Sequence, residues 1–400
     1  MLEDARMTSI RHCGLVLALY VAVFSSGAGA KLAAPQASST GRVTLLRTPD
    51  GGIQPQIALA ADAGVHLLYF KGEASHGDLF YVRLGRDGQF LRPIQVNSHP
   101  GSAIATGSMR GGQIAIGRAG RVHVAWHGSD RAEPRAADGS TPVLYTRLND
   151  GGTQFEPERN LVHSAAGLDA GTIAADLTGN VYVLWHAGLP NTSGEGDRRV
   201  WITRSIDDGR TFARETAAND ALTGACGCCG LSALADRTGN LYLLYRSAAE
   251  VVHRDTYLLT SRDKGHAFTS DKLQAWNVGA CPMSTFSLSE SARHILAAWE
   301  TAGQVQWLQI DIASGRRSPV TPAPGSTNDR KHPVIARNSR GETLLAWTEG
   351  TVWNKGGAVA WQVFDQDGAA TTERGRLPGV PTWGLVAIAA RPDGSFVIVY

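Results

Sequence analysis

The chain has 400 residues, of which 43% are hydrophobic and 18% are charged, and its formal net charge is +2. Because the basic residues are scattered and not clustered, the composition argues against a nucleic-acid or membrane-surface partner. It is ordinary globular material, long enough to bury a large core.

The N-terminus predicts a cleavable export signal. Two arginines precede the apolar run GLVLALYVAVF at 14–24, and the small residues SSGAGA follow it. The run is shorter than the roughly 20 residues that span a bilayer, and the small residues fit cleavage after Ala30. We therefore expect a signal at 1–30, a linker at 31–40 and one domain at 41–400, secreted or periplasmic, with no membrane contact after cleavage.

Seven short segments of β-branched and aromatic residues recur along the chain, their starts separated by between 49 and 60 residues. Another short strand pattern precedes each of them, and no helical periodicity competes. They begin at residues 65, 122, 181, 241, 294, 343 and 396. Repeats of about 50 residues built from short strands predict a β-propeller.

A third element follows the first four pairs of strands. It reads RLGRDGQF at 83–90, RLNDGGTQF at 147–155, RSIDDGRTF at 204–212 and SRDKGHAF at 261–268. In such a hairpin the Asp carboxylate accepts backbone N–H groups while Gly adopts a positive φ. The aromatic residue that follows can then fold back onto the blade.

SIDDGRTF and SRDKGHAF resemble the Asp box of sialidase-like (BNR-repeat) propellers, and the resemblance covers nearly all of 41–400. It implies an all-β propeller of four-stranded blades. Seven strand pairs favour seven blades, and six blades with an accessory pair are the alternative. Because the last pair ends at Tyr400, we expect 42–48 to serve as the outer strand of the final blade and so to close the ring.

The resemblance also implies that the site lies on the face opposite the Asp boxes, at the starts of first strands and the ends of second strands. The strand ends on this face are Lys71, His127, His186, Arg246, Glu300 and Glu349. The strand starts are Gln56, Gln113, Thr172, and the segments 226–229, 281–284 and 331–333.

Four cysteines remain once signal cleavage removes Cys13: Cys226, Cys228, Cys229 and Cys281. An even number in an oxidising compartment favours disulfides. Because the two segments start equivalent strands of neighbouring blades, we expect Cys281 to lie within disulfide reach of one member of the cluster. A bond between Cys228 and Cys229 is the least favoured, because it would strain the peptide between them.

A soft-metal site and a redox centre are the alternatives to structural disulfides. Thiolates and thioethers suit copper or zinc. The candidate metal ligands are Cys226, Cys228, Cys229, Cys281, Met283, His127 and His186. The CGCC and CPM segments also resemble a recurrent pattern of exported bacterial BNR-repeat proteins, in which His often replaces Met283.

Sialidases of this fold clamp a carboxylate with three arginines, one of them at the start of the first inner strand. Here that strand reads GGIQPQIAL and holds glutamines. We therefore expect a monomeric binding protein for a small-molecule, glycan or metal ligand, with a sialidase-type glycoside hydrolase as the alternative. For that alternative, Arg246, Glu300 and Asp255 are the catalytic candidates, and acids of the loops 127–140 and 186–199 could act as general acids.

The tryptophans fall into two groups. Trp126, Trp185, Trp299 and Trp347 recur at one position of the repeat, which predicts core packing. Trp353 and Trp383 break the repeat and, with Arg246, are the candidates for ligand binding.

Overall fold

The computed structural model describes residues 38–107, 110–163, 166–189, 192, 194–325 and 329–400. They lie in one compact unit, Pro35–Tyr400. The expected export signal at 1–30 falls outside the described residues. Within the described part, no helix is long and apolar enough to cross a membrane.

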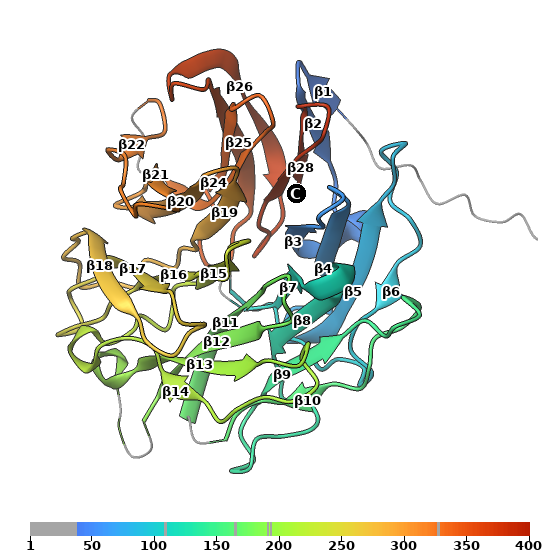
Figure 1. Ribbon diagram of the computed structural model, residues 1–400, viewed down its shortest axis with the longest axis vertical. Coiled ribbons are helices and arrows are strands. Elements are labelled where there is room, and N and C mark those ends of the chain that lie inside the picture. The colour runs from blue at the N-terminus through green and yellow to red at the C-terminus, as the bar shows by residue number, and fades with distance from the viewer. Residues whose placement is uncertain (1–37, 108–109, 164–165, 190–191, 193, 326–328) are drawn as a thin grey trace, which may run out of the picture. The chain divides into compact units, whose positions relative to one another are not determined.

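The described residues form seven sheets of four strands each, arranged around a centre (Figure 1). This confirms the all-β propeller and seven blades. The inner strands contact one another in chain order, and the last contacts the first, which closes the ring. These strands are β3 (Ile53–Leu59), β7 (Gly112–Ile116), β11 (Ala166–Ala175), β15 (Ser232–Ala235), β19 (Ser287–Ser291), β23 (Arg330–Arg337) and β27 (Ala387–Ala390).

The second strands carry the recurring apolar segments. Their residues are mostly buried on both faces, because each blade packs between two neighbours, and β-branched and aromatic side chains fill that space. Trp126, Trp185, Trp299 and Trp347 are all buried there, as predicted. The second strands are β4 (Val65–Glu73), β8 (Val122–His127), β12 (Val181–Gly188), β16 (Leu241–Arg246), β20 (His294–Thr301), β24 (Thr343–Glu349) and β28 (Phe396–Val399).

The outer half of each blade is less regular. Third strands are β5 (His76–Leu84), β9 (Val143–Arg147), β13 (Arg199–Ser205), β17 (Thr256–Ser261), β21 (Gln304–Asp311) and β25 (Gly357–Phe364). Outermost strands are β6 (Ile94–Gln95), β10 (Arg159–Asn160), β14 (Thr216–Ala217), β18 (Thr269–Gln274), β22 (Thr321–Pro322) and β26 (Ala370–Val380). Short 3-10 turns occur at Pro49–Gly51, Arg118–Gly120, Glu195–Asp197 and Ala221–Thr223.

Both ends of the described chain complete the seventh blade. Strand β2 (Val43–Leu46) pairs in parallel with β28, and β1 (Ser38–Thr40) pairs with β2. The segment expected as the outer strand is therefore the third strand, and β1 lies outside it. Hydrogen bonds from the Tyr400 N–H to the Leu46 carbonyl (3.1 Å) and from the Thr48 N–H to the Tyr400 carbonyl (3.0 Å) fix the closure.

The Asp-box hairpins adopt the expected geometry. The Asp207 carboxylate accepts the N–H and hydroxyl of Thr211 at 2.8 and 2.6 Å, and Gly209 has a φ of 76°. Phe212 packs edge-to-face on Tyr145 with ring centroids 4.7 Å apart. Since Tyr145 belongs to the preceding blade, this hairpin joins two blades.

Candidate functional site

The inner strands of five blades share a left-handed residue at or just before their start. These residues are Gln54 (φ 52°), Gly111 (φ 106°), Met283 (φ 48°), His332 (φ 53°) and Trp383 (φ 56°). Four of the five have side chains, for which this conformation is unfavourable. Such strain persists where the surrounding structure enforces it, and it concentrates at functional sites.

The cysteine turn, residues 226–230, sits between three blades. Its Cys226 N–H donates to the Arg246 carbonyl at the end of β16 (2.9 Å). Its Gly230 N–H donates to the Ser284 carbonyl of the following blade (2.9 Å). The Gly227 N–H donates to the Glu195 carboxylate of the preceding blade (2.9 Å).

The sulfur atoms of the turn converge. The Cys226 sulfur lies 3.2 Å from that of Cys228 and 3.4 Å from that of Cys229. Cys281 joins from the next blade, since its sulfur, the Cys228 sulfur and a Glu195 oxygen lie within 4.8 Å of one another. The structure thus brings Cys281 to the cluster. The four described cysteines are free thiols, so a disulfide between them stays a prediction.

Two buried arginines flank these sulfurs and shape their ionisation. Burial opposes ionisation of Cys229, but thiol hydrogen bonds from Cys226 and Cys228 and the charge of Arg246 hold its pKa well below the usual range. The hydrogen bonds to Cys228 and Cys229, together with burial, raise the pKa of Cys226. Burial lowers the pKa of Arg254, but negative charge at the cysteine turn and the bond to Glu195 outweigh burial, so that the pKa of Arg254 is raised. The metal-free cluster therefore favours one thiolate.

Arg246 itself is fully buried. Its guanidinium donates to the carbonyls of Arg254 (2.9 Å) and Glu300 (2.5 Å) and lies 3.9 Å from the Glu300 carboxylate. It also packs 4.9 Å from the Trp276 ring centroid. Burial raises the pKa of Glu300, although the charge of Arg246 opposes this. Both predicted site residues thus lie beneath the surface of the face.

Asp255, the third catalytic candidate, is also buried, at 4% exposure. Its carboxylate pairs with Lys272 (2.6 Å) and accepts the Trp276 N–H (2.9 Å). Both partners of this carboxylate belong to the same blade as Asp255. Their bonds to it fix the loop that carries Arg254.

Three charged side chains from two neighbouring blades support the cysteine turn from the other side. The Asp169 carboxylate accepts from Arg110 (2.8 Å) and from Arg198 (2.5 Å). A Cβ atom on Gly227 would lie 2.9 Å from this carboxylate and closer still to the Arg198 guanidinium. The ion pair therefore packs directly against Gly227, and a larger residue there would displace the Arg198 guanidinium.

The two candidate histidines are buried and neutral. Burial lowers the pKa of both His127 and His186 to about 4. His127 lies near Arg110 and Asp169 and bonds to Thr141 (3.2 Å). His186 lies close enough to Cys229 to sense its charge, and neither of its ring nitrogens has a partner among the described residues.

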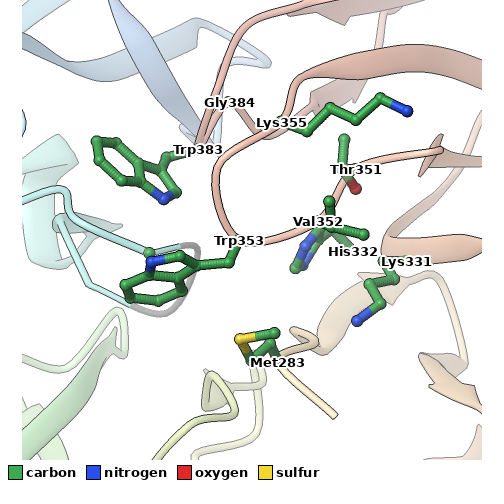
Figure 2. Close-up of a pocket in the computed structure, with 10 residues that line it drawn as sticks. Met283, Lys331, His332, Thr351, Val352, Trp353, Lys355, Trp383 and Gly384 are labelled. Carbon is green, nitrogen blue, oxygen red and sulfur yellow. The ribbon is translucent and has the colours of Figure 1, made fainter. Parts of the chain in front are cut away.

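A shallow recess on the same face lies beside Met283, two residues after Cys281 in the chain (Figure 2). Met283, His332, Trp353 and Trp383 border it, together with Lys331 and Lys355. It measures about 340 Å³ with its open mouth included, but only about 20 Å³ admits the centre of a water molecule. A ligand would therefore lie across the mouth.

The two tryptophans that break the repeat both line the recess, and ligand binding by them stays a prediction. Trp353 is 42% exposed, in contrast to the buried tryptophans of the repeat. It meets Trp383 edge-to-face, with ring centroids 6.2 Å apart. The Trp383 indole N–H is buried without a partner among the described residues.

Sequence reasoning missed Arg110, Asp169, Arg198 and the pairing of Glu195 with Arg254 (2.7 Å). No local motif marks them, because each is separated in the chain from the residues it contacts.

No family model and no curated protein matches the chain. Solved structures match it at low sequence identity. An α-L-arabinanase from Penicillium chrysogenum has 12% identity and a TM-score of 0.53, over 80% of this chain and 94% of that chain. The fucose-binding, six-bladed Aleuria aurantia lectin has 10% identity and a TM-score of 0.50, over 82% and 96%.

Sialidases are among the structures that match. The Hadza microbial sialidase Hz136 has 13% identity and a TM-score of 0.49, over 82% of this chain and 68% of that chain. At such identities a match shows the fold alone. The chain is an all-β, seven-bladed propeller whose structural neighbours include glycan-acting propeller enzymes.

Proposed function

We propose that this chain is an exported binding protein of the sialidase-like propeller type. Its ligand is a glycan or a small molecule that lies across Trp353 and Trp383, beside the cysteine turn. The N-terminal pattern of basic, apolar and small residues supports export to the periplasm or the medium.

The observation that carries this proposal is the strain gathered at one recess. Met283, His332 and Trp383 all line it, and all three have left-handed backbones. Each such residue costs about 1–3 kcal/mol, which the fold must offset elsewhere. Strain of this kind is typical of ligand clamps, because it fixes side chains in place before the ligand arrives.

The lining indicates the chemistry of the ligand. Indole rings present large flat faces that pack on the apolar face of a ring-shaped ligand. Lys331 and Lys355 add positive charge, and none of the described residues that line the recess is acidic. Burial, and then the charge of Lys331, lower the pKa of His332 to about 3, so it stays neutral. These features favour a sugar or similar ring that carries an acidic group.

The burial of the predicted catalytic residues supports binding over hydrolysis. Most glycosidases use two carboxyl groups that flank the scissile bond, and sialidases use a tyrosine as the nucleophile instead. Glu300 and Asp255 are 2% and 4% exposed, and both are engaged within the protein.

Binding is tested by titrating the protein with oligogalacturonate, the acidic probe, and with maltohexaose, the neutral probe. Calorimetry and tryptophan fluorescence measure the binding. We expect the acidic probe to bind, and Trp353→Ala to weaken it at least about tenfold, as expected for an aromatic anchor. Ile206→Ala is the control, since Ile206 is an exposed apolar residue of an Asp-box hairpin.

Two outcomes would contradict the proposal. One is equal binding by the Trp353→Ala variant and the parent protein. The other is turnover of a fluorogenic sialoside by the parent protein that a folded Arg246→Ala variant has lost, which would establish the glycoside hydrolase alternative.

A further inference from the structure

The cysteine turn offers three sulfur atoms in one small volume. The sulfurs of Cys226, Cys228 and Cys229 all lie within 4.8 Å of one another. Cys226 and Cys229 are fully buried, and Cys228 is partly exposed. Three thiols of one turn thus face a common point that is closed on one side and open on the other.

Two buried guanidinium groups near these sulfurs can stabilise negative charge on them. Arg246 and Arg254 are 0% and 2% exposed, and both lie near the sulfurs. The Nε atom of each, and Nη1 of Arg254, have no hydrogen-bond partner among the described residues. An unpaired buried donor on a charged group is costly. Glu195 already pairs with Arg254 (2.7 Å) and Glu300 lies 3.9 Å from Arg246, so a further anion would satisfy the donors that remain unpaired. Thiolates at the neighbouring turn would supply it.

We infer that Cys226, Cys228 and Cys229 bind one Cu(I) ion as thiolates. Binding replaces thiol protons with the metal and transfers no electrons. This inference adds a metal ion to the face of the propeller that carries the proposed ligand site. It does not depend on the tryptophan recess.

The ligand set favours Cu(I) over other ions. Sulfur-only sites select soft ions, whereas calcium and magnesium take oxygen ligands. Structural zinc is almost always four-coordinate. Among the described His, Cys, Asp and Glu side chains, no fourth ligand atom lies within 4.8 Å of all three sulfurs. Glu195 and Cys281 approach Cys228 alone and form a separate group with it.

The chain also protects the three thiols from alternative chemistry. Burial of Cys226 and Cys229 keeps solvent oxidants away from two of the three sulfurs. The ion pair of Asp169 with Arg198 packs against Gly227, in the middle of the turn, and holds the turn in place. Preorganised ligands lose little conformational entropy when the metal binds.

The test is a titration of the reduced, metal-free protein with Cu(I) under anaerobic conditions, in competition with the chromogenic chelator bicinchoninate. We expect the parent protein to withdraw one equivalent of Cu(I) and to develop a thiolate-to-copper absorption band. Cys228→Ser should weaken binding by more than the roughly 10–100-fold that the loss of an outer-shell partner costs. Cys228 is partly exposed, so this change leaves the core intact.

Cys281→Ser tests the ligand assignment, because Cys281 lies outside the three-sulfur group. We expect this variant to retain one equivalent of Cu(I). Loss of the ion here would overturn the three-sulfur site. So would failure of the parent protein to compete with bicinchoninate, tighter binding of Zn(II) than of Cu(I), or a disulfide within 226–229 in freshly isolated protein.

The copper titration contains no glycan, and the glycan titration contains no copper. A negative result in one experiment therefore leaves the other standing, and the two proposals fail separately.

Discussion

The interior of this propeller contains charged side chains and neutral histidines. The protonation state of each depends on the groups packed around it. Arg246 and Glu300 lie under the channel face at 0% and 2% exposure. Replacing one partner of such a pair strands the other in a medium that solvates charge poorly. The loss of stability caused by a substitution here therefore depends mainly on the buried partner that is left unpaired.

Arg246→Met should destabilise the protein strongly. It removes the donor to two carbonyls and leaves the Glu300 carboxylate, 3.9 Å away, without its cation. The expected loss is about 3–5 kcal/mol in the free energy of unfolding, measured by guanidinium titration. Arg316→Met, at an exposed position, is the control and should change it by less than about 0.5 kcal/mol. Equal effects of the two changes would refute the assigned role.

The buried histidines predict a loss of stability in mild acid. Burial, followed by the charge of Arg110, lowers the pKa of His127 from 6.5 to about 4 in the folded protein. Between these two values the unfolded chain binds more protons than the folded chain, so stability falls as the pH falls. Each pKa unit corresponds to about 1.4 kcal/mol.

The measurement is the denaturant midpoint of the metal-free protein at pH 7 and at pH 4.5. We expect His127→Gln to reduce the difference between the two midpoints. His163→Gln, at an exposed position, should leave the difference as it is in the parent. An unchanged difference in His127→Gln would show that other groups cause the acid sensitivity.

At the scale of elements, the Asp-box hairpins stabilise the blades, whereas the left-handed residues near the strand starts shape the channel face. The hairpins satisfy their own backbone, as Asp263 does by accepting the N–H groups of His266 (3.0 Å) and Ala267 (2.9 Å). One hairpin also packs on its neighbour, because Phe212 and Gly209 both contact Tyr145. The strand starts instead direct side chains to the channel face.

Gly209→Ala and Gly88→Ala separate backbone strain from blade packing. Both glycines lie in a hairpin between the third and fourth strands of a blade, with φ of 76° and 78°. A Cβ on Gly88 meets no atom within 4 Å, whereas one on Gly209 meets the Tyr145 hydroxyl. Gly88→Ala should cost about 1–2 kcal/mol for the left-handed backbone alone. Gly209→Ala should cost about 1–3 kcal/mol more, because it overpacks the blade interface.

Thermal or denaturant unfolding of the two variants measures this difference. If both glycines cost the same, the hairpin does not join the blades, and its effect is confined to its own turn.

At the scale of the whole propeller, closure of the ring is the decisive feature. The seventh blade takes β27 and β28 from one end of the described chain and β1 and β2 from the other. Without β2, the edge of β28 would be open, and an open edge pairs with other chains. Closure also protects the neighbouring blades, since β27 contacts both β23 and β3.

Truncation tests the closure directly. Deletion of 1–37 retains β1 and β2 and should leave the melting temperature unchanged, whereas deletion of 1–47 removes both strands. We expect the longer deletion to lower the melting temperature and to produce aggregates in size-exclusion chromatography. A longer deletion that melts and elutes like the shorter one would contradict this.

The sequence by itself determined the strands, a propeller with seven blades favoured over six, and the neighbourhood of the cysteines. Each second strand is a continuous apolar run bounded by turn residues, which leaves a local signal. All of them except β28 pair with the strands that precede and follow them in the chain. The same repeat put Cys228 and Cys281 at equivalent positions of adjacent blades, and their sulfurs do lie within 4.8 Å of each other.

Only the tertiary structure decided the depth and the partners of the site residues. Arg246 ends a strand, a position that predicts an exposed residue at the rim of the channel. In the structure Arg246 is fully buried, and Phe286 of the next blade is among the side chains that cover it. Asp169 contacts Arg110 and Arg198 of other segments, a contact without local sequence signal. Burial and charge pairing arise where blades meet, and that packing depends on side chains far apart in the chain.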